Sequence, residues 1–419
     1  ILAKLKAPLL YLSATLTPAP LQILAEAADI SPHAVLASSA WIYEEFRKVF
    51  RDSIDFINLE KEAGDAAEIY LKNLRTEVCG VEPAKVLEEV CLDGLGAKVL
   101  VVTNTVERAA EIYRECADVC RGKGYNVVLI HGRMSQLHRS SLASKIKCAS
   151  RDNKARLVVI ATQVVEAGID LDADTLITDV APMDSLIQRA GRVLRHRLDR
   201  EGKVVVSISQ DATETCKAVY GNECEEAANK LAELASKCRY VDWRYGFPER
   251  CTAYKILFDA ANKLGAEDLT YDVRSYESKL ISGILYYIPG TPIDKRADDL
   301  EKLFRGSVIR GSVRIPFIVR YKGEEDVVEI PAWKAEKLKG FVKGIAFEVR
   351  NIQSSRELVL SPQEIGFKSF EHFVKEFEER PISVLRKLIR RLRTEDEAHV
   401  VFKGIKLDEK VYDEVVGIV

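Results

Sequence analysis

The chain has 419 residues, of which 47% are hydrophobic and 30% are charged, and its formal net charge is −2. This length is enough for two or three domains with separate cores, and the composition is typical of a soluble globular protein. The small net charge excludes a uniformly basic surface, so binding to nucleic acid would need a local basic groove. No apolar run reaches the ~18 residues of a membrane span and no signal peptide is evident, so we predict a cytoplasmic protein with no membrane partner.

The nine cysteines are scattered and form no C-x-x-C pair. Cys116 and Cys120 lie four residues apart on an expected helix, which could indicate a metal site or a disulfide. We interpret the cysteines instead as small buried residues in a reducing compartment. Intracellular disulfides stay an alternative if the source is a hyperthermophile, which the many charged residues and few Met weakly favour. The initial Ile1 suggests that the sequence starts partway into a longer protein.

The first 95 residues predict few regular elements. An apolar strand at 9–12 leads into Ser13-Ala14-Thr15, and a proline-containing turn and a short helix follow. Residues 36–95 are expected to form a connector, with a strand near 56–59 and an amphipathic helix over 65–78.

Residues 96–240 form the clearest block. Apolar strands are expected at 98–103, 127–130, 157–160, 175–178 and 204–208, and helices at 106–121, 136–147 and 185–194. Strands buried on both faces that alternate with helices predict an α/β fold with a doubly wound parallel sheet. Ligands of such sheets bind at the carboxyl ends of the strands. The polar residues that follow strands here are Thr103, His131, Thr162 and Asp179.

The remaining residues predict a helical segment at 241–310, broken by a loop at 287–292, and then a mixed α+β domain at 311–419. Strands are expected at 313–321, 326–330, 344–350 and 357–360 in a small antiparallel sheet, followed by a helical and then mixed tail. Residues 385–393 form a basic amphipathic stretch. It is either a face that contacts phosphates or a solvated face balanced by nearby glutamates, and we favour the second.

The most informative string is Q-R-A-G-R-V-L-R-H at residues 188–196. A guanidinium group is a planar, permanently charged set of donors that suits phosphate. Arg192 and Arg195 are expected one turn apart on one helix face. That arrangement suits the charge on a γ-phosphoryl group in transfer, which is the role of an arginine finger.

A second motif, residues 160–170, follows a strand and carries Thr162, Gln163, Gly168 and Asp170. Thr162 and nearby amides can bind a backbone phosphate. Gly168 allows a close approach to a nucleotide, and Asp170 can accept from a ribose hydroxyl or orient an arginine. The alternative is an ordinary strand-to-helix turn with an N-cap threonine and no functional role.

Two further motifs are weak when taken alone. Ser13-Ala14-Thr15 is a common tripeptide, and His131-Gly132-Arg133 contains a lone histidine of the kind that is more often structural.

Taken in chain order, these motifs resemble motifs III to VI of the superfamily 2 helicases. Within that superfamily, residues 161–172 and 178–196 resemble the helicase–nuclease family of CRISPR type I interference. The string A-P-x-D-S-L-I-Q-R at 181–189 is fairly specific to it. The resemblance is firm over 96–210, weaker over 1–95 and only positional over 211–419.

This resemblance implies a RecA-like second helicase lobe at 96–240, the end of a first lobe at 1–35, a connector at 36–95, a helical linker at 241–310 and a C-terminal domain at 311–419. It implies an ATP-dependent translocase that moves 3′ to 5′ on single-stranded DNA and joins an RNA-guided surveillance complex. The resemblance assigns catalysis at ATP to Gln188, Arg192 and Arg195, and binding of the cofactor to Gly168, Asp170 and Arg189. It assigns contacts along the DNA track to Thr103, Gly132, Arg133, Thr162 and Gln163. It assigns the coupling of ATP status to nucleic-acid binding to Ser13, Ala14 and Thr15.

Several parts of such a motor have no match in the sequence. No G-x-x-x-x-G-K-[ST] string occurs, no acidic Mg²⁺ motif precedes Ser13, and no His-Asp dipeptide of an HD nuclease is present. Asp396-Glu-Ala-His399 matches the acidic Mg²⁺ motif in sequence, but it lies after the arginine string and not before Ser13. We therefore interpret this match as a chance occurrence. We therefore expect ATP and Mg²⁺ to be cofactors of a longer protein, with no metal ligands in this chain and no ATP hydrolysis by the chain alone. We expect an HD nuclease either upstream of this chain or on a separate subunit.

Two alternatives remain open. One is a DNA-repair or RNA helicase of the same superfamily, and the other is a non-catalytic module that binds nucleic acid or protein.

Overall fold

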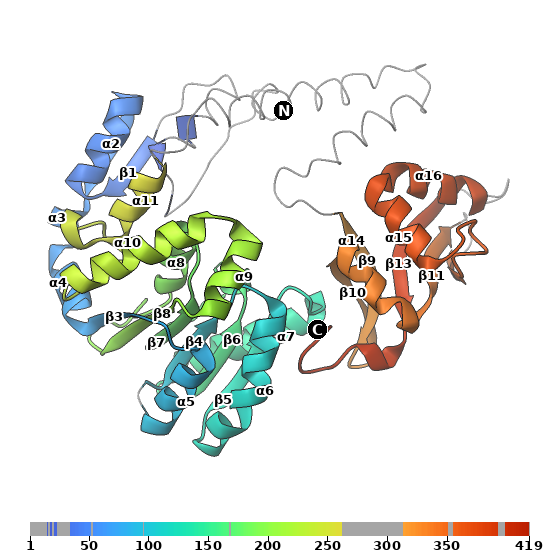
Figure 1. Cartoon of the computed structure of the whole chain (residues 1–419), viewed down its shortest axis with the longest axis horizontal. Helices are drawn as coiled ribbons and strands as arrows, with labels where there is room; N and C mark the ends of the chain where they lie inside the picture. Colours follow the sequence, from blue (N-terminus) through green and yellow to red (C-terminus); the bar gives the residue numbers. More distant parts are fainter. Residues whose placement is uncertain are drawn as a thin grey trace. The chain divides into compact units, whose positions relative to one another are not determined.

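The computed structural model describes residues 15, 17, 18, 21, 22, 34–51, 53–94, 96–166, 169–261, 313–350, 355–392 and 399–418. They belong to two compact units (Figure 1). The first unit lies within residues 1–132 and 141–271, and the second within 133–140 and 272–419. The expected strand at 9–12, the loop at 287–292 and the tetrapeptide at 396–399 lie partly or wholly outside the described residues, as does most of the expected linker.

The first unit is built on a six-stranded sheet with the strand order β3-β8-β7-β4-β6-β5, in which every pair is parallel. The strands are β3 (Leu74–Cys79), β4 (Lys98–Val102), β5 (Asn126–Ile130), β6 (Leu157–Ala161), β7 (Thr175–Asp179) and β8 (Gly202–Ser207). Every residue of β4, β6 and β7 is buried, as the uninterrupted apolar runs predict.

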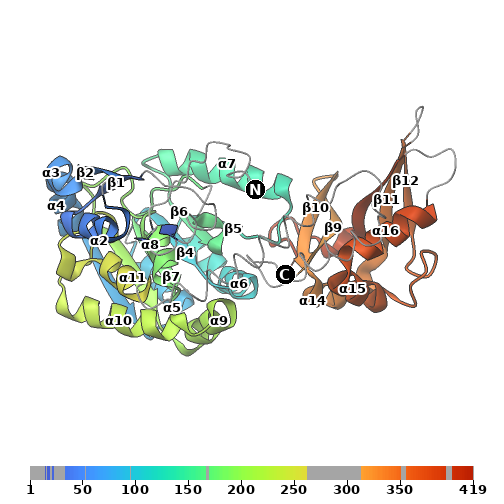
Figure 2. The ribbon, with the colours of Figure 1, turned by 90° about the horizontal axis from the view of Figure 1, so that it is seen from above.

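Helices cover both faces of this sheet. The helices are α5 (Pro83–Asp93), α6 (Val106–Gly122), α7 (Gln136–Arg151), α8 (Met183–Ala190), α9 (Gln210–Tyr220), α10 (Glu223–Lys237) and α11 (Ala253–Ala261), with short 3₁₀ turns η1 (Gln163–Val165) and η2 (Glu249–Cys251). Figure 2 shows α7 on one side of the strands and α5 and α9 on the other. The α/β fold with a RecA-like lobe is therefore confirmed.

A small parallel pair precedes the large sheet. β1 (Ala34–Ser38) pairs with β2 (Ile54–Asn58), and α2 (Ala40–Phe50), α3 (Leu59–Glu62) and α4 (Gly64–Asn73) surround them. The strand expected near 56–59 is thus present, two residues early. The helix expected over 65–78 is wrong beyond Asn73, because residues 74–79 form β3 and pair with β8. Tertiary pairing overrides the helical period at this sheet edge.

The second unit holds a five-stranded sheet with the order β10-β9-β13-β11-β12. Its strands are β9 (Arg314–Tyr321), β10 (Glu324–Pro331), β11 (Val342–Arg350), β12 (Ser355–Leu360) and β13 (His399–Leu407). The four expected strands are confirmed, but the sheet is mixed, because β13 runs parallel to β9. Around it lie α14 (Ala332–Ala335), η3 (Glu336–Phe341), α15 (Phe370–Glu379), α16 (Pro381–Leu392) and η4 (Glu409–Val411).

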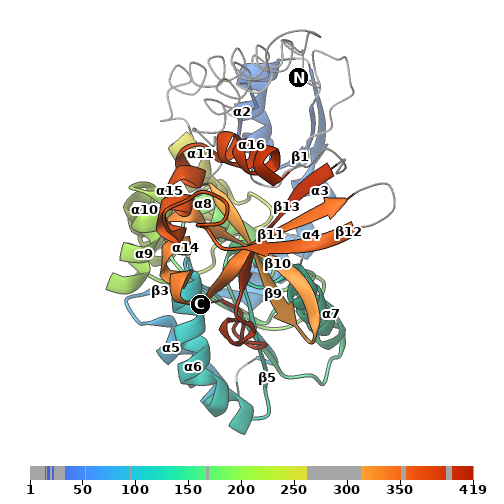
Figure 3. The same cartoon turned by 90° about the vertical axis from the view of Figure 1, so that its right-hand side faces the viewer.

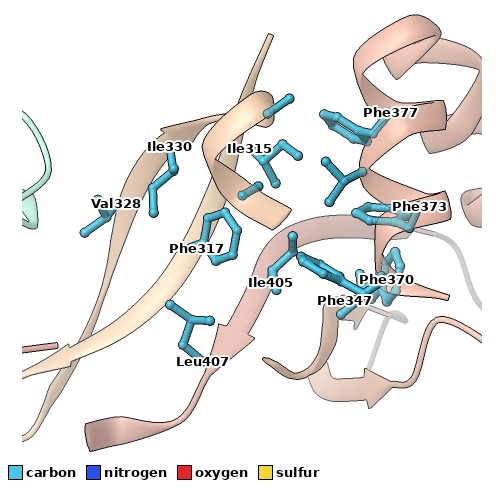
Figure 4. Packing of buried hydrophobic residues seen from close by; sticks show 14 of the residues in the cluster. Ile315, Phe317, Val328, Ile330, Phe347, Phe370, Phe373, Phe377, Ile405 and Leu407 are labelled. Carbon is cyan, nitrogen blue, oxygen red and sulfur yellow. The ribbon is translucent and has the colours of Figure 1, made fainter. Parts of the chain in front are cut away.

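An aromatic core joins this sheet to its helices. Figure 4 shows Phe370, Phe373 and Phe377 of α15 facing Phe347 of β11 and Ile405 of β13. α15 and α16 lie together beside the strands (Figure 3). The apolar positions of α16, such as the buried Leu388, join the same core, so its orientation is fixed by hydrophobic burial.

The interpretation of the cysteines is wrong for four of them. Cys216 is bonded to Cys224, and Cys238 to Cys251. The thiols of Cys91, Cys116 and Cys120 are free and buried, as expected of small hydrophobic residues. No group of three or more His, Cys, Asp or Glu that could hold a metal ion is found among the described residues.

None of the helices in the described ranges has the length and apolarity that a membrane crossing demands.

The candidate site at the carboxyl edge of the parallel sheet

The carboxyl ends of β4, β6 and β7 bring the predicted polar residues to one edge of the sheet. Thr103 follows β4, Thr162 and Gln163 follow β6, and Asp179 ends β7. Thr103 and Asp179 have no exposed surface and Thr162 is 3% exposed. The Thr103 hydroxyl donates to the carbonyl of Thr105 (3.0 Å). The two threonines therefore present little side-chain surface to a ligand.

A fully buried arginine lies at the centre of this edge. Arg189 donates five hydrogen bonds: to Glu166 Oε1 (2.8 Å), Thr178 Oγ1 (2.9 Å), the Asp179 carbonyl (3.2 Å), Asn104 Oδ1 (3.3 Å) and Tyr220 Oη (3.2 Å). Its side chain is 0% exposed. A guanidinium group has five N–H donors, so these bonds use its whole capacity. The geometry supports a role for Arg189 in holding the strand ends together more than one in binding a cofactor.

Tyr220, at the end of α9, is a member of this network that motif reasoning missed. Its hydroxyl accepts from Gln163 Nε2 (2.9 Å) as well as from Arg189. Gln163 also donates to the carbonyl of Asn104 (2.9 Å). Burial raises the pKa of the Tyr220 hydroxyl, which therefore stays neutral. No sequence spacing signals this contact, because Tyr220 lies 57 residues from Gln163.

A second buried ion pair, also missed, joins α6 to β7. Arg108 Nε donates to both carboxylate oxygens of Asp179 (3.1 Å each), and its other end pairs with Glu82. Burial raises the pKa of Asp179, and the positive charge of Arg108 opposes that rise. The Asp179 carboxylate is thus committed to structure.

The arginine string leaves the helix before its second and third arginines. α8 ends at Ala190, so the expectation that Arg192 and Arg195 share a helix face is wrong. Residues 192–195 instead lie along residues 172–173: the Ala173 amide donates to the Arg192 carbonyl (2.8 Å) and the Leu194 amide to the Ala173 carbonyl (3.0 Å). The amide of Arg195 donates to Asp172 Oδ1 (2.8 Å). Gly191 is the C-cap of α8, and beyond it the backbone pairing with Ala173 replaces the helical spacing.

Arg192 is held by backbone carbonyls of the preceding motif. Its Nη1 donates to Ile169 (3.1 Å) and its Nη2 to Glu166 (2.5 Å). Its Nε is buried and has no hydrogen-bond acceptor within the described part of the chain. Burial and the neighbouring charge of Arg195 hold the pKa of Arg192 below its ordinary value. Arg192 is thus a cation fixed in place beside a second cation.

Asp170, Arg195 and His196 form a partly exposed cluster next to Arg192. Asp170 Oδ1 lies 3.4 Å from both Arg195 Nη1 and His196 Nε2. The hydrogen bond from His196, followed by the charge of Arg195, lowers the pKa of Asp170. The structure therefore brings Asp170, Arg192 and Arg195 close together, as they must be if they form a single site.

The other predicted residues are placed as follows. Gln188 Nε2 donates to Thr15 Oγ1 (3.3 Å), which joins the arginine string to the coupling motif. Ser13, Ala14 and Gly168 lie outside the described residues. Gly132 and Arg133 are half-buried, and Arg133 is grouped with the second unit.

Known proteins are similar to this chain in the region that carries the site. Residues 95–198 match the family model described as CRISPR-associated nuclease/helicase Cas3, C-terminal. A Cas3 nuclease/helicase of Methanothermobacter thermautotrophicus is 32% identical over 179 residues, 42% of this chain and 20% of that protein. One from Streptococcus thermophilus is 37% identical over 129 residues, 29% of this chain and 13% of that protein.

A wider relative and a solved structure are also similar. An ATP-dependent rRNA helicase of Candida albicans is 34% identical over 119 residues, 28% of this chain and 20% of that protein. The crystal structure of T. fusca Cas3 with AMPPNP has a TM-score of 0.40 and 22% identity, and covers 60% of this chain and 32% of that one. The chain spans a fifth or less of the length of the Cas3 relatives quoted above.

The parallel RecA-like sheet, with an arginine-bearing turn at its carboxyl edge, is similar to the second lobe of superfamily 2 helicases. Within that class, residues 95–198 match the C-terminal model of the Cas3 family, so the resemblance seen in the motifs is confirmed over this part of the chain.

Proposed function

We propose that this chain is part of an ATP-dependent superfamily 2 DNA helicase of CRISPR type I interference, where it supplies the arginine-bearing half of the ATP site. The Cas3 relatives are described as nuclease/helicases, which supports a helicase as the whole protein's activity. We also propose a role in antiviral defence in the cytoplasm, on the same resemblance.

One observation carries the proposal: Arg192 is fixed by two carbonyls of residues 166 and 169 and stands beside Arg195 and Asp170. Preorganised cations are suited to stabilise charge that develops on a phosphoryl group. Asp170 holds Arg195 in position, so its expected contact with a ribose would compete with that ion pair. Gln188, tied to Thr15, would report the state of ATP to the coupling motif.

Binding of ATP and Mg²⁺ would need further protein groups besides Arg192, Arg195, Asp170 and Gln188. The guanidinium groups fit a triphosphate, because Arg192 Nε has no acceptor among the described residues. When bound, Mg²⁺ would neutralise phosphate charge, and no Mg²⁺ ligand is assigned to this chain. We infer that the chain alone does not hydrolyse ATP.

The DNA track is proposed along the same sheet edge. Because Thr103 and Thr162 are buried and Gln163 is bonded to Tyr220, contacts with DNA would come from backbone amides and from Gly132 and Arg133. A related solved assembly is described as an RNA-guided surveillance complex. We propose such a complex, with or without a separate HD nuclease subunit, as the partner.

Strand separation by the intact protein tests this function. We expect ATP-dependent unwinding of a DNA duplex with a 3′ single-stranded tail and none with a 5′ tail. A preference for an RNA duplex would instead support the rival RNA helicase. Failure to unwind any duplex, with ATP binding retained, would favour a non-catalytic binding module.

A further inference from the structure

A disulfide closes the loop between α10 and α11. Cys238 follows α10 directly and is bonded to Cys251 at the end of η2. We call residues 238–251 the disulfide loop. Both of its cysteines are partly exposed, whereas Cys216 and Cys224, which form the other disulfide, are fully buried. Reduction begins when a thiolate attacks a disulfide sulfur, so a disulfide with exposed surface reacts before a buried one.

One buried carboxylate organises the interior of the disulfide loop. Asp242 is 0% exposed, and its side chain accepts hydrogen bonds from the four amides of residues 244–247, at distances between 2.6 and 3.1 Å. The neighbouring Trp243 is buried, and its Nε1 donates to Thr76 Oγ1 of β3 (3.0 Å), which fastens the loop to the sheet. The side chain of Arg244 therefore extends from a well-defined backbone.

Arg244 joins the disulfide loop to the arginine string. Its Nη2 donates to the carbonyl of Val193 (3.2 Å), the residue that follows Arg192. Its guanidinium lies over the buried ring of Tyr70, 4.6 Å from the ring centroid, in a cation–π contact. The ring restricts the positions of the guanidinium, so the donor that reaches Val193 is held in place. Arg244 thus supports the backbone of the turn that carries Arg192.

General stabilisation by the disulfide does not explain this contact. A disulfide restricts the unfolded chain whether or not its loop touches a functional site. Here the loop supplies a hydrogen bond to the motif that carries Arg192, so opening of the loop removes a bond from that motif. Loops open more readily than buried strands, and reduction removes the covalent tie between the ends of this loop. The redox state of the disulfide therefore has a physical route to the arginine string.

We propose that Arg244 is a positioning residue for the arginine string, and that the Cys238–Cys251 disulfide is a redox switch for its contact with Val193. A dithiol reductant operates the switch: one of its thiolates attacks one cysteine sulfur and releases the other cysteine as a thiolate, and its second thiolate then displaces the first cysteine. Two electrons and two protons pass to the protein, which gains two thiols, and the reductant becomes a disulfide. This inference rests on the proposed function only in taking Arg192 to face ATP.

Stepwise alkylation of the 419-residue chain tests the reduction step. Free thiols are first blocked with N-ethylmaleimide, and the chain is then treated with dithiothreitol for increasing times and quenched with excess iodoacetamide. We expect mass spectrometry to show that Cys238 and Cys251 are labelled at least about tenfold faster than Cys216 and Cys224, because access limits thiol–disulfide exchange. Equal rates, or faster labelling of the buried pair, would overturn the proposal.

Amide hydrogen exchange of the same chain, read by NMR, tests the positioning step. The reporter is the amide of Leu194, which donates to the Ala173 carbonyl in the arginine-bearing turn. We expect mild reduction to speed the exchange of Leu194 and of Gly246 by about tenfold or more, because a hydrogen bond from a charged donor opposes this opening. The amide of Val159 in β6 should not change. Faster exchange at Gly246 with no change at Leu194 would overturn the proposal.

Variants of Arg244 show whether it carries the effect. In Arg244→Met, Leu194 should exchange rapidly before reduction and respond no further, while Gly246 still responds. Arg244→Lys keeps a cation and a donor and should restore part of the response, and the exposed Arg239→Met, in the same loop, should behave as wild type. A wild-type response of Leu194 in Arg244→Met would contradict the proposal. The wild-type measurement decides where a variant fails to fold, and no readout uses ATP, so the proposal and the helicase function can fail separately.

Discussion

At the scale of single residues, two arginines of one motif have opposite environments. Arg189 is fully buried and has five bonds, whereas Arg192, three positions later, donates to two backbone carbonyls and its Nε has no acceptor among the described residues. The sequence predicts that both serve the nucleotide, because spacing alone does not show which side chain points inward. Burial in the structure separates a positioning residue from a candidate catalytic one.

We expect Arg189→Met to destabilise the chain by about 3–5 kcal/mol, because it leaves the partner carboxylate of Glu166 uncompensated. Urea unfolding at neutral pH measures the change. The control is Lys203→Met, whose exposed pair with Glu77 should cost less than about 1 kcal/mol. Equal losses in the two variants would show that Arg189 is not a structural centre.

The pH response of Asp170 tests the cluster beside Arg192. Its pKa is lowered mainly by the hydrogen bond from His196 and then by Arg195. A carboxyl group with a lowered pKa adds stability above its unfolded pKa, and that stability is lost as the pH falls through the folded pKa. We therefore expect His196→Ala to move the pKa of Asp170 up toward its ordinary value, and Arg195→Ala to move it less.

Carbon NMR titration of the Asp170 carboxyl group measures these shifts. An unchanged pKa in His196→Ala, or a larger rise in Arg195→Ala, would contradict the described contacts.

At the scale of elements, the turn after α8 decides where the arginines lie. Leu194 has a φ of +49°, unusual for a residue with a branched side chain, and is fully buried. Its amide donates a hydrogen bond to the Ala173 carbonyl, and its side chain lies against Gly202 at the start of β8. A helical pattern predicts α8 well, but such long-range backbone pairing leaves no periodic signal.

Gly202→Ala should therefore disturb this turn. A Cβ atom at Gly202 would lie 2.8 Å from Cγ and 2.9 Å from Cδ1 of Leu194, and overpacking of this kind costs about 1–3 kcal/mol. Thermal unfolding measures the loss. Gly80→Ala is the control, because no heavy atom lies within 4 Å of its Cβ position. Wild-type stability in Gly202→Ala would mean that Leu194 is free to move.

At the scale of the whole molecule, the sequence predicts the parallel sheet far better than the contacts of its edge. The five strands expected within 96–240 are present, since apolar runs report burial on both faces. The sequence does not predict β3, because a strand at the edge of a sheet has a weaker hydrophobic pattern. It does not predict the roles of Tyr220 and Arg108, because their hydrogen-bond partners are distant in sequence. The expected domain bounds stay predictions, although the sheet takes β3 from the expected connector.

The rate of DNA-stimulated ATP hydrolysis by the intact protein tests the central claim most directly. We predict that Arg192→Ala lowers kcat by about 10³–10⁵-fold, as loss of an arginine finger does, while the exposed Arg121→Ala leaves it unchanged. The 419-residue chain alone should show no hydrolysis. DNA-stimulated hydrolysis by the chain alone, or wild-type kcat in the Arg192→Ala protein, would contradict the account.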